Sequence, residues 1–177
     1  MKLSPARGPM SAAVDPAEFE ALVGPWLDEM YRAAAAIVGR AEAADVTQDA
    51  LLDAWRGLQR LRDPARIRPW LHAIVANRSR KQIRSWHSRP RLVDLSVTPE
   101  PAADDGDPGD LAARRDQLDR AFDRLSADQR ICVALRYSID LPVSEVAEAL
   151  GIPEGTVKSR LHAAVHRLRA SLVEEDR

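Results

Sequence analysis

A proline-rich and acidic segment, residues 89–110, interrupts a chain that is otherwise patterned almost continuously as helix. The segment holds four prolines and two glycines and has no apolar periodicity, which is typical of a linker. Residues 92–111 carry six acidic side chains and no lysine or arginine. The sequence therefore predicts an all-α protein, in which two small helical domains are joined by a flexible acidic linker.

The composition agrees with this fold class. The chain is 45% hydrophobic and only 5% aromatic, and its abundant alanine and leucine favour helix over sheet. No apolar run approaches the roughly 20 residues that cross a membrane, and residues 1–10 lack the apolar stretch of a secretory signal. We therefore expect no membrane insertion and a cytoplasmic location, whether the natural start is Met1 or Met10. The expected divisions are a disordered tail at 1–14, a first domain at 15–88, the linker at 89–111 and a second domain at 112–177.

Capping residues and apolar spacing predict the individual helices. In the first domain they cover residues 15–38, with a break at Gly24-Pro25, then 41–61 and 70–86. The apolar stripe of the second of these helices is expected to consist of Leu51, Ala54, Leu58 and Leu61. In the second domain the helices are expected at 111–125, 126–137, 143–150 and, after Ile152-Pro153, to about residue 173.

The last two helices have the plan of a helix-turn-helix, with Gly151 ending the first of them. One face of the final helix is apolar and consists of Val157, Leu161, Ala164, Leu168 and Leu172. The opposite face carries Ser159, His162, Ala163 and His166, and is edged by Lys158, Arg160, Arg167 and Arg169. A small polar face edged by cations suits the DNA major groove. On the pattern alone, an ordinary amphipathic surface helix remains an open alternative.

Charge is distributed locally rather than globally, because the net charge is only −1. Residues 60–91 hold ten cations and a single acid, Asp63, which predicts salt-dependent contacts with phosphate groups. The predicted second helix is the opposite: an acidic face that repels DNA and suits a basic protein partner. Its members are Glu42, Asp45, Gln48, Asp49 and Asp53. An ordinary solvated helix face is the alternative reading of this second pattern.

Enzymatic and metal chemistry have little support in the sequence. Cys132 lies in an apolar stretch and is expected in the core rather than as a nucleophile. His162 and His166 are four residues apart, but no third metal ligand accompanies them. We expect His72 and His87 on the surface, no metal and no cofactor.

Three segments resemble the extracytoplasmic-function (ECF) sigma factors of RNA polymerase, a group of the sigma-70 family. Residues 45–55 read DVTQDALLDAW, and residues 68–84 read RPWLHAIVANRSRKQIR, which is similar to regions 2.3 and 2.4. Residues 125–172 are similar to region 4, and the string GIPEGTVKSRL is the most specific part. The resemblance covers residues 18–86 and 112–173, with an unmatched linker between them.

The resemblance implies a function and its partners. The chain would bind core RNA polymerase, with its acidic helix on the clamp helices of the largest subunit and its second domain on the flap of the second-largest subunit. It would recognise promoter DNA and answer to an anti-sigma factor. The residues implied at the polymerase are Asp45, Gln48, Asp49 and Asp53. Those implied at the −10 element are Arg62, Arg66, Asn77, Arg80, Lys81 and Arg84. Those implied at the −35 element are Arg136, Lys158, Ser159, Arg160 and His162.

The sequence also departs from the family pattern at three positions. Lys81 stands where many relatives have Asp, Ala163 where many have a DNA-contacting Arg, and Pro142 where a Ser N-cap is common. These departures bear on which promoter is read rather than on the family. A helix-turn-helix regulator that acts without polymerase is the alternative function, and it leaves the resemblance of the first domain unexplained.

Overall fold

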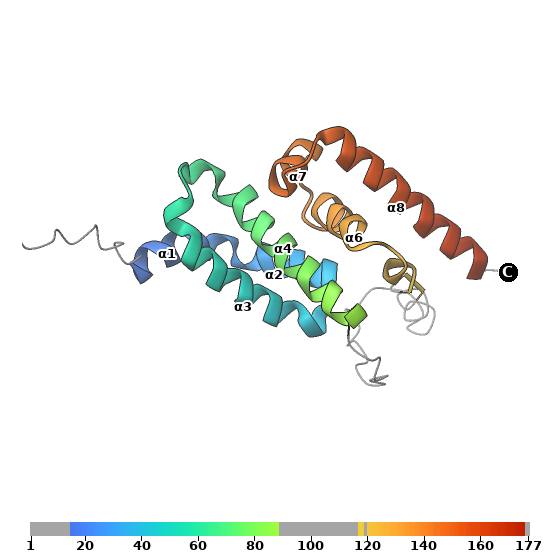
Figure 1. Cartoon of the computed structure of the whole chain (residues 1–177), viewed down its shortest axis with the longest axis horizontal. Coiled ribbons are helices and arrows are strands. Elements are labelled where there is room, and N and C mark those ends of the chain that lie inside the picture. Colours follow the sequence, from blue (N-terminus) through green and yellow to red (C-terminus); the bar gives the residue numbers. More distant parts are fainter. Residues whose placement is uncertain (1–14, 89–116, 119, 176–177) are drawn as a thin grey trace, which may run out of the picture.

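The computed structural model describes residues 15–88, 117–118 and 120–175. The elements within these ranges are all helical, which confirms the predicted fold class. The predicted tail and linker lie outside the described residues. Figure 1 shows two groups of helices side by side, one from each half of the chain.

The N-terminal half consists of α1 (Pro16–Val23), η1 (Gly24–Trp26), α2 (Leu27–Val38), α3 (Arg40–Gly57), η2 (Leu58–Arg60), η3 (Pro64–Arg66) and α4 (Ile67–Ser88). The predicted start is confirmed, because the Asp15 carboxylate accepts a hydrogen bond from the amide of Ala17. The predicted break at Gly24 is the 3₁₀ turn η1. At Gly39 the backbone has a φ of 85°, a left-handed conformation that favours glycine and lets α3 follow α2 directly.

The core of this half lies between α2, α3 and α4. Large side chains come from α2 and α4, including Met30, Ile37, Leu71 and Val75, all at most 1% exposed. Helix α3 contributes mainly small residues to this core: Ala43, Ala50 and Ala54. These small side chains allow the neighbouring helices to approach α3 closely. The buried face of α3 also starts earlier than the predicted stripe, at Ala43 rather than at Leu51. Of that stripe, Ala54 is buried, whereas Leu51, Leu58 and Leu61 are half-buried.

The C-terminal half consists of helical residues 120–123, α6 (Ala127–Val133), the π-helical turn η4 (Ala134–Ser138), α7 (Val143–Leu150) and α8 (Glu154–Glu175). The predicted capping box is confirmed, because Ser126 and Gln129 each bond the backbone amide of the other. Gly151 ends α7 with a φ of 63°. Val157, Leu161 and Ala164 are buried, as the helix-turn-helix pattern predicts.

The two halves are in contact, which the sequence did not predict. Helices α2 and α4 pack against α6, η4 and α7, whereas α8 lies on the outer side of α6 and α7. Buried residues of both halves form one continuous apolar cluster. The expectation that His72 lies on the surface is wrong: its side chain is 2% exposed, beneath this contact. The reason is that helix α4 is covered on two sides, so a residue outside its apolar spacing is also enclosed.

Candidate functional site

The acidic face of α3 contains exposed and paired members. Asp45 and Gln48 are exposed and make no ion pair within the described part of the chain. Glu42 accepts a hydrogen bond from the side chain of Gln82 on α4. The face is therefore tied to α4 at Glu42 and again farther along the helix, and it is open between these two ties, at Asp45 and Gln48.

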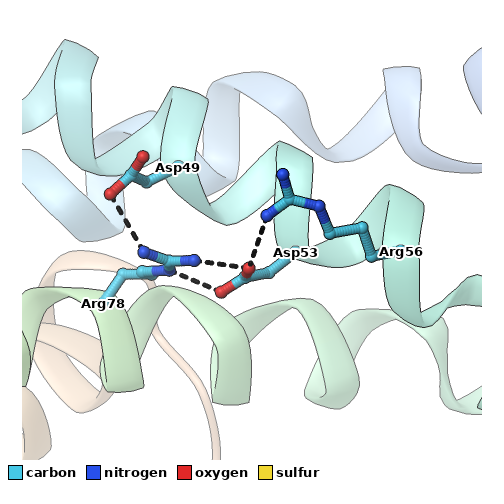
Figure 2. Close-up of polar contacts among 4 residues, drawn as sticks. All are labelled: Asp49, Asp53, Arg56 and Arg78. Carbon is cyan, nitrogen blue, oxygen red and sulfur yellow. Dashed lines mark hydrogen bonds and ion pairs between the residues drawn. The ribbon is translucent and has the colours of Figure 1, made fainter.

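The tie is a network centred on Arg78 of α4, shown in Figure 2. Its guanidinium donates two hydrogen bonds to the carboxylate of Asp53 and a third, of 3.1 Å, to Asp49. Arg56 adds a longer contact of 3.9 Å to Asp53. The hydrogen bond from Arg78, together with its charge, lowers the pKa of Asp53. Asp53 is therefore firmly ionised and held, whereas Asp49, with a side chain 58% exposed, keeps part of its surface open to a partner.

A groove of about 490 Å³ lies at the start of α4. Its shape depends on the loop before that helix, where Asp63 accepts a hydrogen bond of 3.0 Å from the amide of Ala65 and so begins η3. The lining includes three arginines and the indole of a tryptophan, and one carboxylate, that of Glu148, comes from the C-terminal half. The lining residues are Arg60, Leu61, Arg62, Asp63, Arg66, Pro69, Trp70, Ala73 and Glu148. Cations around an aromatic surface suit a nucleotide base with its phosphates.

The remaining candidates of the −10 set lie farther along α4. Asn77 is exposed one turn beyond Ala73 and does not line the groove; its side-chain oxygen accepts a hydrogen bond of 2.8 Å from Arg80. Lys81 and Arg84 are exposed on the same helix. The structure thus places Arg62 and Arg66 at the groove, and Asn77 and the later cations along the helix surface next to it.

The helix-turn-helix surface is formed by α7, the Gly151 turn and α8. Lys158, Ser159 and His162 are exposed, as predicted. Lys158 makes one long contact of 3.8 Å with Glu154 of its own helix, and the Ser159 hydroxyl donates to a backbone oxygen one turn back. These side chains leave a polar face open toward solvent.

Two other candidates of the −35 set are engaged by the protein. Arg136, in the π-helical turn, pairs with Asp140 at 2.9 Å and lies over the ring of Tyr137. Arg160 pairs with Asp128 at the start of α6, at 3.0 Å. Arg160 therefore points away from the exposed polar face of α8.

Several polar contacts, both between α3 and α4 and between the two halves, escaped sequence reasoning. Arg78 was counted only as one cation of the basic stretch. The carboxylates that bind the arginines of that stretch come from other elements: Asp49 and Asp53 bind Arg78, and Glu29, Asp128, Glu145 and Glu148 bind the others. The one available signal was the imbalance of charge in residues 60–91, since ten cations beside one acid need partners from elsewhere in the chain or outside it.

The described residues contain no cluster of three or more side chains able to hold a metal ion. Cys132 is buried, as expected, and this burial raises the pKa of its thiol. Among the described helices, none is long and apolar enough to cross a membrane.

Comparisons with known proteins agree with both halves of this geometry. The family model for sigma-70 region 2 matches residues 22–89, and that for sigma-70 region 4 matches residues 121–170. The ECF RNA polymerase sigma factor SigL of Mycobacterium tuberculosis is 36% identical over 175 residues, which cover 96% of this chain and 97% of the relative. The chain belongs to the ECF RNA polymerase sigma factors. Members of this family are transcription initiation factors.

Other sigma factors resemble the chain at lower identity. The sigma-E factor of Streptomyces coelicolor is 31% identical over 90% of this chain and 88% of its own. Among solved structures, the sigma factor RpoE of Bartonella quintana, in complex with the anti-sigma factor NepR, is similar with a TM-score of 0.64 and 25% identity. That match covers 88% of this chain and 96% of the other. CnrH, solved with the cytosolic domain of CnrY, shares the fold at a TM-score of 0.62 and 24% identity, over 94% of each chain.

Proposed function

We propose that this sigma factor binds core RNA polymerase through the acidic face of α3 and directs it to promoters by reading −10 and −35 elements. The observation that carries the proposal is the pair of sigma-70 matches in the expected order, together with the exposed acidic face in the region 2 match. The proposed domains are residues 15–88 and 112–177, joined by the linker at 89–111.

The proposed polymerase contact consists of Asp45, Gln48, Asp49 and Asp53 facing the clamp helices of the largest subunit. Asp45 and Gln48 supply the exposed part of this surface. Arg78 holds Asp53 and Asp49 in place from α4, so it acts as a positioning residue for the contact. The C-terminal domain would reach the flap of the second-largest subunit.

The proposed −10 contact is the groove beside η3 with the adjoining surface of α4. The groove is large enough for a nucleotide base, and Arg62 and Arg66 stand at its edge. Asn77 would bond the flipped base or its neighbour, and Arg80, Lys81 and Arg84 would follow the backbone. Extracting a base from the stack costs a few kcal/mol, which makes capture in such a groove a selective step.

The proposed −35 contact is the outer face of α8. Lys158, Ser159 and His162 are exposed there, so they can meet base edges and phosphates in the major groove. Arg136 and Arg160 join this contact in the proposal when their ion pairs with Asp140 and Asp128 are exchanged for phosphate.

We further propose that the protein has no catalytic activity of its own, works in the cytoplasm beside the polymerase, and is controlled by an anti-sigma factor. The complexes of the similar structures RpoE–NepR and CnrH–CnrY support this last point. A helix-turn-helix regulator that acts without polymerase is not favoured, because it gives no role to the region 2 match.

Association with core polymerase tests the proposed function. Asp45→Lys with Asp49→Lys should weaken it at least tenfold, about 1.4 kcal/mol, because charge is reversed at a complementary interface. Asp45→Lys alone should cause much of the loss, and it leaves the Arg78 network intact. The matched control is Glu20→Lys with Asp28→Lys, which changes net charge equally at exposed positions of α1 and α2. Unchanged affinity of well-folded Asp45 variants for core would refute the polymerase contact.

A further inference from the structure

We propose that Asp140 limits how strongly the −35 surface binds DNA, because its carboxylate occupies Arg136, an arginine that the proposed function assigns to the −35 element. The inference rests on the proposed function for the role of Arg136. For the role of Asp140 it rests on the local geometry of residues 134–141, which lie between α6 and α7 in the C-terminal half.

The backbone of this segment is irregular at two neighbouring places. Ala134–Ser138 form the π-helical turn η4, a rare conformation that often occurs at functional sites. Two residues later Asp140 has a φ of 57°, and among the described residues it is the one non-glycine with a positive φ. Such a backbone is unfavourable for a residue with a side chain, although Asp and Asn tolerate it better than most. Glycine would suit this position, so the carboxylate there points to a role for the side chain.

Buried neighbours fix this irregular segment in place. The side chains of Leu135, Ile139 and Leu141 are at most 6% exposed. The amide of Ile139 donates a hydrogen bond of 3.2 Å to the carbonyl of Ala134, and the amide of Leu141 donates one of 3.0 Å to the carbonyl of Leu135. The backbone that carries Asp140 is therefore anchored on both sides, so its carboxylate stays close to Arg136.

Arg136 has its partners within this segment. Its Nη1 atom donates a hydrogen bond of 2.9 Å to the Oδ1 atom of Asp140, and its guanidinium lies over the ring of Tyr137, 5.6 Å from the ring centroid. The side chain of Asp140 is 91% exposed and makes no other hydrogen bond or ion pair within the part of the chain that the structure describes. The carboxylate of Asp140 is thus committed to Arg136 alone.

Two electrostatic effects then oppose the binding of a DNA phosphate to Arg136. The phosphate must displace the carboxylate of Asp140, and the displaced carboxylate remains beside the phosphate and repels it. Arg136 and Asp140 together present DNA with almost no net charge, so the pair contributes little to the release of counterions. Removal of the carboxylate would convert a neutral pair into a free cation on the −35 surface.

A double-mutant cycle at these two positions tests the inference. Asp140→Asn removes the charge and keeps a residue that tolerates a positive φ. Asp28→Asn is the charge-matched control, because it makes the same change at an exposed position of α2. The probe is a fluorescein-labelled duplex that holds the −35 element of a promoter mapped by run-off transcription and ends before its −10 element. Binding of the holoenzyme is measured by fluorescence anisotropy over a series of salt concentrations.

Asp140→Asn should bind this duplex about fivefold tighter than the control, and the slope of log affinity against log salt should steepen by about one unit. Arg136→Ala should change the affinity of the wild-type protein by less than about twofold, but in the Asp140→Asn variant it should remove the whole gain. Asp140→Gly, which suits the backbone, should reproduce the gain and the steeper slope, so the result does not depend on how asparagine is accommodated.

The outcomes separate this inference from the proposed function. Equal binding by Asp140→Asn and its control, with Arg136→Ala harmful by itself, would overturn the inference and leave Arg136 in the proposed −35 set. A gain that survives the addition of Arg136→Ala would also overturn it, because the carboxylate would then act on DNA without Arg136. If Arg136→Ala had no effect in either background, the proposed role of Arg136 at the −35 element would fall together with the inference.

Discussion

The two surfaces proposed to read DNA differ in how the folded chain presents them. On the −10 side, Arg66 and Arg80 are bound by carboxylates of the other half. On the −35 side, Lys158 and His162 are exposed on the outer face of α8. Two arginines of the −10 set are thus paired across the contact between the halves, whereas the paired arginines of the −35 set, Arg136 and Arg160, have partners within their own half.

This difference separates two tasks. An exposed helix-turn-helix face can meet duplex DNA without rearrangement, because its side chains already point to solvent. The proposed −10 surface would hold unstacked DNA, and two of its arginines, Arg66 and Arg80, already pair with carboxylates of the other half. We therefore expect changes on the −10 side to affect opening and melting, and changes on the −35 side to affect duplex recognition.

The largest expected effect is on the pH dependence of stability, and it concerns His72, which lies beneath the contact between the halves. Burial lowers its pKa to about 4, and the charge of Arg68 acts in the same direction, whereas the charge of Glu29 and the backbone of Arg68 oppose the shift. The charged groups that face it are Glu29 and Arg68, with Glu145 beyond them.

In the unfolded chain His72 takes up a proton as the pH falls below about 6.5, whereas the folded chain resists until about 4. The unfolded state thus binds more protons in this window, and the free energy of unfolding falls by about 1.4 kcal/mol per pH unit, or about 3 kcal/mol in all. The stabilisation is complete above pH 6.5 and is lost as the pH falls toward 4. Urea unfolding from pH 7 to pH 4.5 measures it, with His72→Gln as the comparison. Equal pH slopes for the two proteins would show that His72 is not held neutral.

The next effect separates melting from duplex recognition on the −10 side. Asn77→Ala should leave binding to the −35 duplex intact and reduce open-complex formation by roughly 30-fold, since base capture is worth a few kcal/mol. Permanganate footprinting with core polymerase scores the open complex. Asn77 is exposed and bonded only to Arg80 among the described residues, so stability should change little. A loss of duplex binding in this variant would erase the proposed distinction between the two surfaces.

The smallest effect is expected on the open surface. Replacing Lys158 and Ser159 by Ala should weaken recognition of the −35 element by about tenfold, the lower part of the range of about 1–3 kcal/mol for a good base contact. The readout is the difference in affinity between the −35 sequence and a scrambled duplex, measured with holoenzyme. Arg169→Ala, an exposed cation farther along α8, is the control and should reduce both affinities alike. If the variant lost promoter melting but still distinguished the −35 sequence from the scrambled duplex, the proposed role of Lys158 and Ser159 in −35 recognition would be wrong.

The sequence predicted most of the fold because its signals are local. The break at Gly24-Pro25, the capping box at Ser126 and the Gly151 turn each depend on residues within one turn, and all three are observed. The acidic face of α3 was also predicted, because its spacing is a property of a single helix. Its partner Arg78 was not, since the pairing of α3 with α4 joins residues 25 positions apart.

The contact between the halves was beyond sequence reasoning for the same physical reason. Burial of His72 depends on α4 being covered from two sides, and the partners of Arg66 and Arg80 are 82 and 48 positions away. Charge balance could indicate that the arginines needed partners, but not whether DNA or the chain itself would supply them.

The most direct test of the account compares promoter binding with and without core polymerase, by fluorescence anisotropy at physiological salt. The promoter is first mapped by run-off transcription on the segment upstream of the gene itself. The account predicts sub-micromolar, sequence-specific binding only when core is present, because core would position both DNA-reading surfaces, and Arg66 and Arg80 of the proposed −10 set pair with carboxylates in the free chain. Tight, sequence-specific binding by the free protein would contradict it and would favour a regulator that acts without polymerase.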